Sequence, residues 1–334
     1  MTKILLSIVI PLYNQEKFVK LNAEKLIRQI SNQPIEIIFV DDGSIDDTSS
    51  EINKLRINNE QQIILINQSN HGAYHARNQG LKKSRGEFVY FIDGDDFVTN
   101  EFVSVIVPVL KQNYQKDLFV FGYDRVTMKG EVISEYFDRY NFPSNVGSIS
   151  GRLYDVYVKK KYRLSNINVI YKSKFLRESL IEYPALYKGE DIVFIFKAFI
   201  GTNQIMFINK RLAFYIIHEE SISHNSSIKR LDTVIARLLI LRKTKTIKNE
   251  DLTHFFRRLF YRTIKAYLKE LTRIDHINLI NSEKKILQEY PNLKKDLIYE
   301  IKKWPYLGFF TRRYYLALIR FNFIGKKYLL KMHV

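Results

Sequence analysis

The chain has 334 residues, a net charge of +18 and no cysteine. Its length is enough for two domains and a sizeable hydrophobic core. The lack of cysteine excludes disulfide bonds, thiolate metal sites and cysteine nucleophiles. No uncharged apolar run in the sequence reaches the roughly 18 to 20 residues of a membrane-spanning helix. Ile4–Ile10 lacks a small-residue cleavage site and runs into Pro11–Asn14, so we expect a buried first strand there rather than a signal peptide.

The first hundred residues alternate between strand and helix patterns. Four apolar runs predict buried strands, at Leu5–Ile10, Ile35–Val40, Ile63–Ile66 and Glu87–Ile92. Between them, helices are predicted at Glu16–Ile30, from Asp46 or Asp47 to Asn58, and at Gly72–Lys83. Strands that alternate with helices predict an α/β layer structure with a largely parallel sheet.

A polar cluster follows each of the four predicted strands. The clusters are Pro11–Glu16, Asp41–Asp47, Asn67–Asn78 and Asp93–Asp96. In open α/β sheets, ligands bind beyond the carboxyl ends of the strands. We therefore expect the four clusters to form one site at the same edge of the sheet.

The fourth cluster, in the stretch FVYFIDGDDF (residues 88–97), places three carboxylates within four residues. Asp93, Asp95 and Asp96 repel one another unless a cation joins them, and Gly94 permits a tight bend between them. A hard divalent cation such as Mg²⁺ prefers oxygen ligands and often binds through one or two carboxylates plus substrate phosphates. The alternative is an acidic turn in which Asp96 caps the next helix.

The second and third clusters offer complementary groups. Asp41 and Asp42 are hydrogen-bond acceptors that suit nucleobase N–H groups or ribose hydroxyls. Arg77 carries a guanidinium, which donates two parallel hydrogen bonds to phosphate oxygens. With the acidic cluster, these residues predict a nucleoside-diphosphate site. The alternatives are a common turn at Asp42–Gly43 and a solvated arginine on a helix.

Five motifs occur in a specific order and spacing. They read SIVIPLYNQEKFV (7–19), IEIIFVDDGSIDDT (35–48), NHGAYHARNQGL (70–81), GEFVYFIDGDDFV (86–98) and GED (189–191). Over about the first 200 residues, the chain thereby resembles the family 2 glycosyltransferases of the GT-A fold. The resemblance implies a Rossmann-like mixed sheet flanked by helices. It also implies transfer of a sugar from a nucleoside diphosphate, usually UDP, with inversion at the anomeric carbon.

The resemblance also implies roles for single residues. The base and ribose would be held by Pro11, Tyr13, Asp41 and Asp42, and Arg77 would face the nucleotide. Asp93 and Asp95 correspond to the DXD motif, which binds the donor together with Mn²⁺ or Mg²⁺.

Residues 99–225 are expected to complete the catalytic domain and to shape the acceptor site. Thr99 is predicted to cap a helix that runs to Leu110 and is kinked by Pro108. Strands are predicted at Leu118–Tyr123 and Asn168–Tyr171.

The motif Gly189–Asp191 opens the apolar stretch Ile192–Ile200. A carboxylate at such a position is ordinarily a helix cap. The resemblance implies instead that Asp191 is the general base for the acceptor hydroxyl and that Glu190 assists acceptor binding. It also implies a metal-ligating role for His218, for which the alternative is a surface histidine.

The last third of the chain carries most of the positive charge. Residues 226–334 hold 25 Lys and Arg against 9 Asp and Glu, a net charge of +16, which leaves +2 for residues 1–225. Aromatic and basic residues are interleaved in Trp304–Leu330, which suits an anionic membrane interface. A nucleic-acid interface and a bundle with a solvated basic face are the alternatives. Helical spacing occurs at Leu231–Leu241, Phe255–Leu271, Asn281–Glu289 and Leu293–Ile301.

The sequence thus predicts a GT-A catalytic domain at residues 1–225, with a nucleotide-sugar half (1–98) and an acceptor half (99–225), and a basic helical region at 226–334. We expect a metal-dependent inverting hexosyl- or N-acetylhexosaminyltransferase that uses a UDP-sugar and a bacterial glycan or lipid-linked glycan acceptor. It would act in the cytoplasm as a peripheral protein at the inner face of the cell membrane, without binding nucleic acid. The alternative is a non-catalytic basic nucleotide-binding protein recruited to anionic membrane or nucleic acid.

Overall fold

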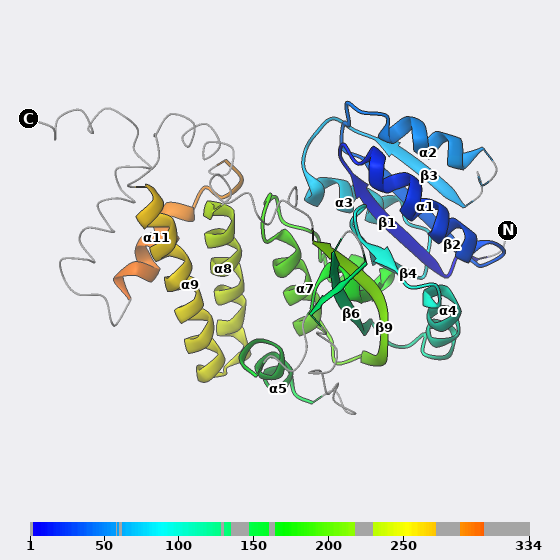
Figure 1. The fold of residues 1–334 in the computed structure, drawn as a ribbon. Helices are drawn as coiled ribbons and strands as arrows, with labels where there is room; N and C mark the ends of the chain where they lie inside the picture. The colour runs from blue at the N-terminus through cyan, green and yellow to red at the C-terminus, as the bar shows by residue number, and fades with distance from the viewer. Residues whose placement is uncertain are drawn as a thin grey trace, which may run out of the picture. The chain divides into compact units, whose positions relative to one another are not determined.

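The computed structural model of the chain describes residues 3–57, 59, 62–127, 130–134, 147–159, 164–217, 230–271 and 288–303. Contacts divide the chain into two compact units, residues 1–225 and 226–334. In Figure 1 the first unit runs from blue to green and contains the sheet, and the described part of the second unit consists of helices.

The first unit is built on one mixed sheet with the strand order β3-β2-β1-β4-β8-β6-β9-β5, and β7 pairs with β6. β1 (Leu6–Leu12), β2 (Ile35–Asp41), β3 (Ile63–Asn67) and β4 (Phe88–Phe91) are parallel and confirm the four predicted strands. β8 runs antiparallel to both β4 and β6, so the sheet is mixed, and the predicted parallel pairing holds among β1–β4 and between β6 and β9. The remaining strands are β5 (Phe97–Val98), β6 (Leu118–Thr127), β7 (Val132–Ser134), β8 (Val169–Lys172) and β9 (Ile205–Ile217).

Helices connect the strands and cover the sheet. α1 begins and ends where the sequence predicts, whereas α2 ends at Arg56, two residues before the predicted end. The helices of this unit are α1 (Glu16–Ile30), α2 (Thr48–Arg56), α3 (Ala73–Lys83), α4 (Phe102–Gln112), α5 (Ile149–Leu153), α6 (Ser173–Glu178) and α7 (Glu190–Gly201). A π-helical turn follows α5 at Tyr154–Val158, and a short 3-10 turn precedes β8 at Asn166–Asn168.

Two local predictions are corrected by the structure. The N-cap of α4 is Glu101, and the Thr99 hydroxyl is buried without a hydrogen-bond partner in the described part of the chain, so the predicted Thr99 cap is wrong. β1 continues through Pro11 to Leu12. The backbone polar groups of Val9 and Pro11 point toward β4. Pairing with β4 ends at Val9, so no carbonyl of β4 needs the N–H that Pro11 lacks.

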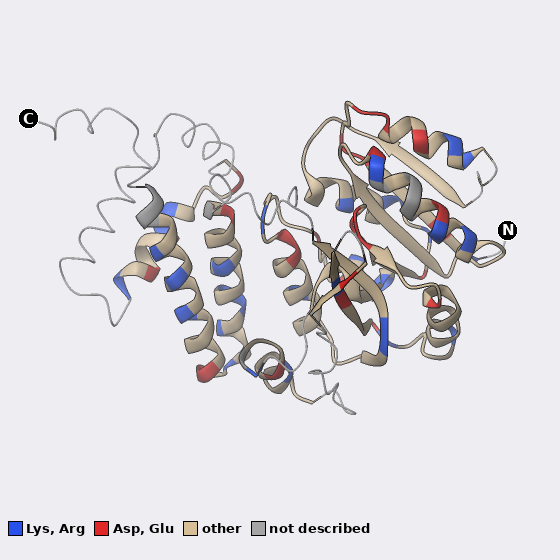
Figure 2. Cartoon of the chain, viewed as in Figure 1, with Lys and Arg blue, Asp and Glu red and all other residues tan. Residues whose placement is uncertain are grey.

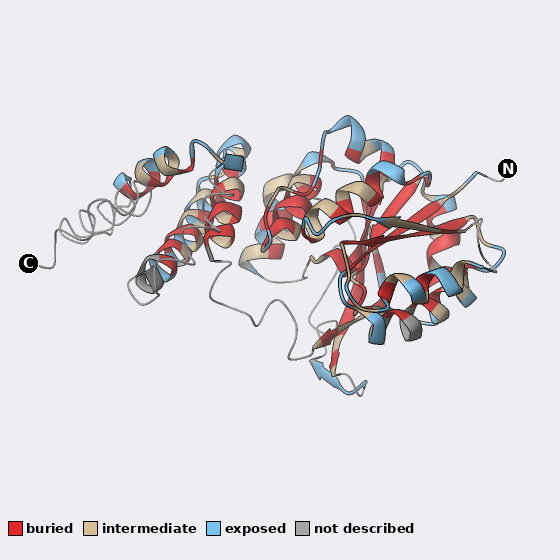
Figure 3. Cartoon of the chain, turned by 90° about the horizontal axis from the view of Figure 1, so that it is seen from above, coloured by how far each residue is buried: buried red, intermediate tan, exposed pale blue. Residues whose placement is uncertain are grey.

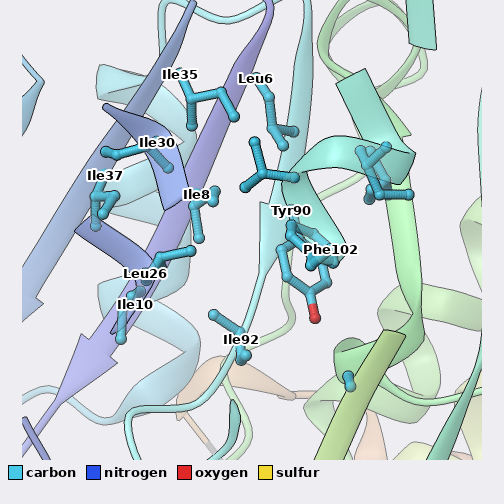
Figure 4. Packing of buried hydrophobic residues seen from close by; sticks show 14 of the residues in the cluster. Leu6, Ile8, Ile10, Leu26, Ile30, Ile35, Ile37, Tyr90, Ile92 and Phe102 are labelled. Carbon is cyan, nitrogen blue, oxygen red and sulfur yellow. The ribbon is translucent and has the colours of Figure 1, made fainter. Parts of the chain in front are cut away.

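The two faces of the parallel strands pack on different helices. One face is covered by α1 and α4, and Figure 4 shows this core. On the other face, α3 approaches β1 closely, because a Cβ atom at Gly80 would lie 2.2 Å from Val9 Cγ1. Figure 3 shows the buried strands between helices whose outer faces are exposed. The labelled core residues are Leu6, Ile8, Ile10, Leu26, Ile30, Ile35, Ile37, Tyr90, Ile92 and Phe102.

The second unit contains α8 (Arg230–Thr244), α9 (Glu250–Leu271) and α11 (Leu293–Lys302), which confirms three of its predicted helices. Arg242 pairs with Asp296, and Lys245 Nζ lies 2.6 Å from Glu300 Oε1, so ion pairs join α8 and its C-terminal turn to α11. Most of Asn281–Glu289 and all of Trp304–Leu330 lie outside the described residues. Among the residues that the structure describes, no helix is long and apolar enough to cross a membrane.

Candidate active site

The carboxyl ends of the four parallel strands meet at one edge of the sheet. The register pairs Leu12 with Asp41 and Asp41 with Asn67, so β1, β2 and β3 end side by side. β4 ends next to them, since the Ile92 N–H donates to the Val9 carbonyl at 3.2 Å. The polar clusters after these strands therefore lie at one edge, as the sequence predicts.

The loops after β1 and β2 are tied together by hydrogen bonds. The Asn14 N–H donates to Ser44 Oγ, and the Ile45 N–H donates to Asn14 Oδ1, both at 2.9 Å. Asn14 has a left-handed φ of 50°, a conformation that asparagine tolerates better than most residues. The neighbouring Tyr13 is 47% exposed, whereas Pro11 is buried in β1. Tyr13 therefore presents an aromatic surface beside a fixed pair of loops.

Asp41 and Asp42 are buried, and each accepts hydrogen bonds from segments at the carboxyl edge of the sheet. Asp41 accepts from the Ser44 N–H at 2.9 Å and from the Ser49 hydroxyl. Asp42 accepts three hydrogen bonds of 2.7, 2.8 and 2.7 Å from the loop at residues 68–72. The two carboxylates thus fix the loops after β2 and β3. Their contact with a base or ribose stays a prediction.

Arg77 on α3 lies between two carboxylates from distant parts of the chain. Its Nη2 donates to Asp93 Oδ1 at 2.6 Å, and its Nη1 donates to Glu190 Oε1 at 2.9 Å. The side chain of Arg77 is 5% exposed, against 38% for Asp93 and 11% for Glu190. Burial alone would lower the pKa of Arg77, but the two carboxylates raise it above its ordinary value, so the guanidinium stays charged.

The acidic cluster after β4 has one buried and two partly accessible members. Asp93 and Asp95 are half-buried, whereas Asp96 is buried and accepts the Ile216 N–H of β9 at 3.1 Å. β5 follows this cluster, so the alternative in which Asp96 caps a helix is wrong. Burial, and then the charges of Asp95 and Asp93, raise the pKa of Asp96. The carboxylates thus disfavour one another's charged forms, and a cation bound beside them would offset this repulsion.

The donor set fits a divalent cation that binds together with a phosphate ligand. Within the described residues, no group of three or more His, Asp or Glu side chains is arranged to hold a metal ion by itself. Mg²⁺ usually takes one or two carboxylates from the protein and completes its shell with phosphates and water. The half-buried Asp93 and Asp95 supply that number of carboxylates. His218, the third predicted ligand, lies outside the described residues.

α7 begins at the Gly-Glu-Asp motif, as predicted. Gly189 is its N-cap and has a φ of 84°, which glycine adopts without strain. Burial, and then the charge of Asp191, raise the pKa of Glu190 to about 7, although Arg77 acts in the opposite direction. Burial also raises the pKa of Asp191, which is half-buried. A partly accessible carboxylate with a raised pKa suits proton transfer near neutral pH.

Tyr183 is a site residue that sequence reasoning missed. The Arg77 guanidinium carbon lies 5.3 Å from the centre of its ring, and the ring stacks on Phe194 of α7 with centres 3.9 Å apart. Tyr183 lies in a stretch without helix or strand periodicity, and only the neighbouring GED motif could have drawn attention to it.

The sequence matches the model of the family described as "Glycosyl transferase family 2" over residues 7–176, which is half of the chain. It is 28% identical over 225 residues to "Glycosyltransferase GlyA" of Streptococcus pneumoniae, covering 65% of this chain and 31% of GlyA. It is 27% identical over 236 residues to "Putative glycosyltransferase EpsH" of Bacillus subtilis, covering 69% and 66%. To "Poly(ribitol-phosphate) beta-N-acetylglucosaminyltransferase TarS" of Staphylococcus aureus it is 26% identical over 223 residues, covering 66% and 37%. The chain thus spans about a third of the length of GlyA and TarS.

Solved structures show the same fold. Staphylococcus aureus TarS 1–349 in complex with UDP-GlcNAc matches with a TM-score of 0.67 and 20% identity, covering 95% of this chain and 90% of that one. The mannosyltransferase PcManGT from Pyrobaculum calidifontis in complex with GDP-Man and Mn²⁺ matches with a TM-score of 0.51 and 12% identity, covering 96% and 88%. The predicted GT-A fold, a mixed sheet flanked by helices, is confirmed.

Proposed function

Because the chain belongs to glycosyl transferase family 2, we propose that it transfers a sugar from a UDP-sugar, with inversion, to a hydroxyl of a bacterial cell-envelope glycan. The observation that carries the proposal is the cluster of Arg77, Asp93, Glu190 and Asp191 at the carboxyl edge of the sheet. This cluster joins the proposed diphosphate side of the site to a carboxylate that suits a general base.

The proposed donor site follows the loops after β1, β2 and β4. The exposed ring of Tyr13 stacks on the base, and the loop fixed by Asp41 holds the ribose. The half-buried Asp93 is the proposed residue at the diphosphate end. UDP is favoured as the nucleotide because TarS, which is similar in fold, was solved with UDP-GlcNAc and with UDP.

Asp191 is the proposed general base, and Glu190 assists in forming the acceptor side of the site. Asp191 takes the proton of the acceptor hydroxyl while that oxygen bonds to the anomeric carbon from the face opposite the nucleotide. The bond from the anomeric carbon to the diphosphate oxygen breaks, and the diphosphate leaves with the electron pair. The N-terminus of α7 favours the charged form of Asp191 before the transfer.

Asp93 and Asp95 are the proposed ligands of Mn²⁺ or Mg²⁺, and the bound ion supplies positive charge for the departing diphosphate. The turn that presents them packs tightly on the loop after β1, since a Cβ atom at Gly94 would lie 1.9 Å from Gln15 Oε1. His218 is kept as a proposed further ligand, from the resemblance alone.

The second unit is proposed to hold the enzyme at an anionic membrane surface, where lipid-linked acceptors are found. Arg258, Arg262 and Lys265 are exposed on one face of α9 and form no ion pair with other described residues. Figure 2 shows Lys and Arg on successive turns of α9. These three residues are part of the net charge of +16 on residues 226–334.

The test is a screen of nucleotide sugars with Mn²⁺ present and nucleoside diphosphate release as the readout. We expect one UDP-sugar to release UDP, excess chelator to stop the release, and Mn²⁺ or Mg²⁺ to restore it. Asp95→Ala should remove activity without lowering the unfolding temperature, whereas Asp251→Ala, an exposed aspartate on α9, should change neither.

Full activity in excess chelator would refute the proposed role of the divalent metal ion. UDP binding without turnover of any sugar would instead support the non-catalytic nucleotide-binding protein.

A further inference from the structure

Arg77 connects the two carboxylate groups on which the proposed chemistry depends. Its bonds to Asp93 Oδ1 (2.6 Å) and Glu190 Oε1 (2.9 Å) join the loop after β4 to the first turn of α7. Glu190 directly precedes Asp191, so any bond that fixes Glu190 also fixes the helix turn that presents Asp191. A single guanidinium thus holds both sides of the site.

The position of Arg77 is unlike that of a phosphate-binding arginine. Its side chain is 5% exposed, both Nη groups donate to carboxylates, and Nε is buried without a partner in the described part of the chain. Two of its five N–H donors are used by the carboxylates, and the 5% exposure of the side chain leaves the other three with little access to an incoming diphosphate. The contacts therefore favour a role inside the protein framework.

The next residue on α3 reinforces the same connection. Asn78 Nδ2 donates to the Tyr183 carbonyl at 2.9 Å, and the Tyr183 N–H donates to Asn78 Oδ1 at 3.0 Å. The Tyr183 ring stacks on Phe194 of α7 and lies beside the Arg77 guanidinium. α3 therefore holds both the segment before α7 and the first turn of α7.

We propose that Arg77 and Glu190 form a positioning bridge that fixes Asp191 relative to Asp93, so that base and diphosphate are held at the correct separation. This proposal rests on the proposed glycosyltransferase function and makes Glu190 a positioning residue for Asp191. Glu190 acts as a hydrogen-bond acceptor for Arg77 and exchanges no proton with the acceptor.

Two substitutions at Glu190 separate this role from a chemical one. Glu190→Gln keeps the length of the side chain and an oxygen that can accept from Arg77 Nη1, whereas Glu190→Met keeps the length and removes the acceptor. A misplacement of about 1 Å can cost about 100-fold in rate, so we expect Glu190→Met to lower kcat by about 100-fold and Glu190→Gln by less than about 10-fold. The Kd for UDP, measured by calorimetry, should stay within about threefold in both, because the lost interaction acts after donor binding.

The chain offers a matched control in a second buried glutamate. Glu36 on β2 is fully buried, accepts from Arg85 Nε at 2.6 Å and from Ser7 Oγ at 2.6 Å, and lies at the start of its strand, away from the carboxyl edge. Glu36→Met should lower the urea midpoint at least as much as Glu190→Met, yet leave the kcat of the folded protein unchanged.

If Glu190→Met does not fold, Glu190→Leu removes the same acceptor and leaves the bond from Arg77 to Asp93 in place. We then expect its kcat to be about 100-fold below the wild type, since the bond between Arg77 and Glu190 is missing.

The proposal is overturned if Glu190→Gln is as slow as the Glu190 variant that lacks the acceptor, if that variant keeps the wild-type kcat, or if Glu36→Met loses kcat to the same degree. If the wild-type protein transfers no sugar, the proposed function itself is refuted. If the wild type is active and the variants behave otherwise than expected, only the positioning bridge is refuted.

Discussion

Asp191 is the side chain on which the proposed transfer depends, and its ionisation gives a test. Burial raises its pKa above the ordinary value of 3.8. A general base works only when deprotonated, so kcat should fall as the pH drops through this raised pKa, at a higher pH than an exposed aspartate would give. Asp191→Asn should lower kcat by roughly 10² to 10⁴-fold with UDP binding largely kept.

The measurement is kcat across the pH range for both proteins. The residual activity of Asp191→Asn should lack the acidic limb that Asp191 produces. A variant with the normal rate would show that Asp191 is only a helix cap.

The sequence predicts a site residue when it belongs to a local motif. It does not predict contacts between residues that are far apart in the sequence. The acidic cluster at residues 93–96 and the GED motif follow strand and helix signals that are local in the sequence. The bond from Arg77 to Glu190 spans 113 positions, and no local pattern encodes which carboxylate an arginine meets. Similarly, the Asp42 carboxylate accepts hydrogen bonds from the backbone N–H groups of His71 and Gly72 in another loop. The sequence pattern does not show that these two loops meet.

The contact between α3 and β1 gives a prediction at the level of packed elements. A methyl group at Gly80 would lie 2.2 Å from Val9 Cγ1, so Gly80→Ala must push the helix from the sheet and should lower the free energy of unfolding by about 1–3 kcal/mol. Combining it with Val9→Ala should cost less than the sum of the single losses, because the new methyl group occupies the vacated space.

Urea unfolding measures these effects, and Gly151→Ala serves as the control. A Cβ atom there would meet only Ser148 Oγ, at 3.3 Å, so helix propensity predicts little change or a gain of about 0.5–1 kcal/mol. Equal losses at Gly80 and Gly151 would contradict the packing argument.

The elements that the sequence missed have weak or broken patterns. β9 covers Ile205–Ile217, but its exposed polar triplet at residues 209–211 interrupts the apolar run, so only its end reads as a strand. β5 and β7 have two and three residues, too few for a period to be recognised. β1, β2 and β4 were found because each is buried on both faces, which produces a continuous apolar run. β3 is only partly buried, but its Ile-Ile-Leu-Ile run is also continuous.

The uneven charge of the chain predicts salt-sensitive attachment to membranes. Each Lys or Arg near an anionic surface contributes about 1 kcal/mol, so Arg258→Glu with Arg262→Glu should weaken binding to anionic vesicles strongly at low salt. Removing residues 304–334 should also weaken it, while UDP binding persists, because the candidate donor residues lie upstream. Binding of the intact protein should fall with salt but not vanish, since inserted aromatic side chains are not screened.

Vesicle co-sedimentation measures this attachment. Lys82→Glu with Lys83→Glu changes the net charge equally, at exposed positions of α3, and should have a smaller effect. Indifference of the intact protein to anionic vesicles, or loss of UDP binding on truncation, would refute the proposed role of the second unit. Tighter binding to nucleic acid than to vesicles would favour the alternative.

The bridge between Arg77 and Glu190 also sets an order of events while the protein is being synthesised. The two residues are 113 positions apart. At ribosomal rates of about 5–20 residues per second, roughly 6–23 s pass between the synthesis of Arg77 and that of Glu190. By the end of this interval the nascent chain contains β1–β4 and Asp93, but it contains neither the second partner of Arg77 nor the proposed base. Such a nascent chain, shorter than 190 residues, therefore carries the candidate donor-site residues without the proposed base.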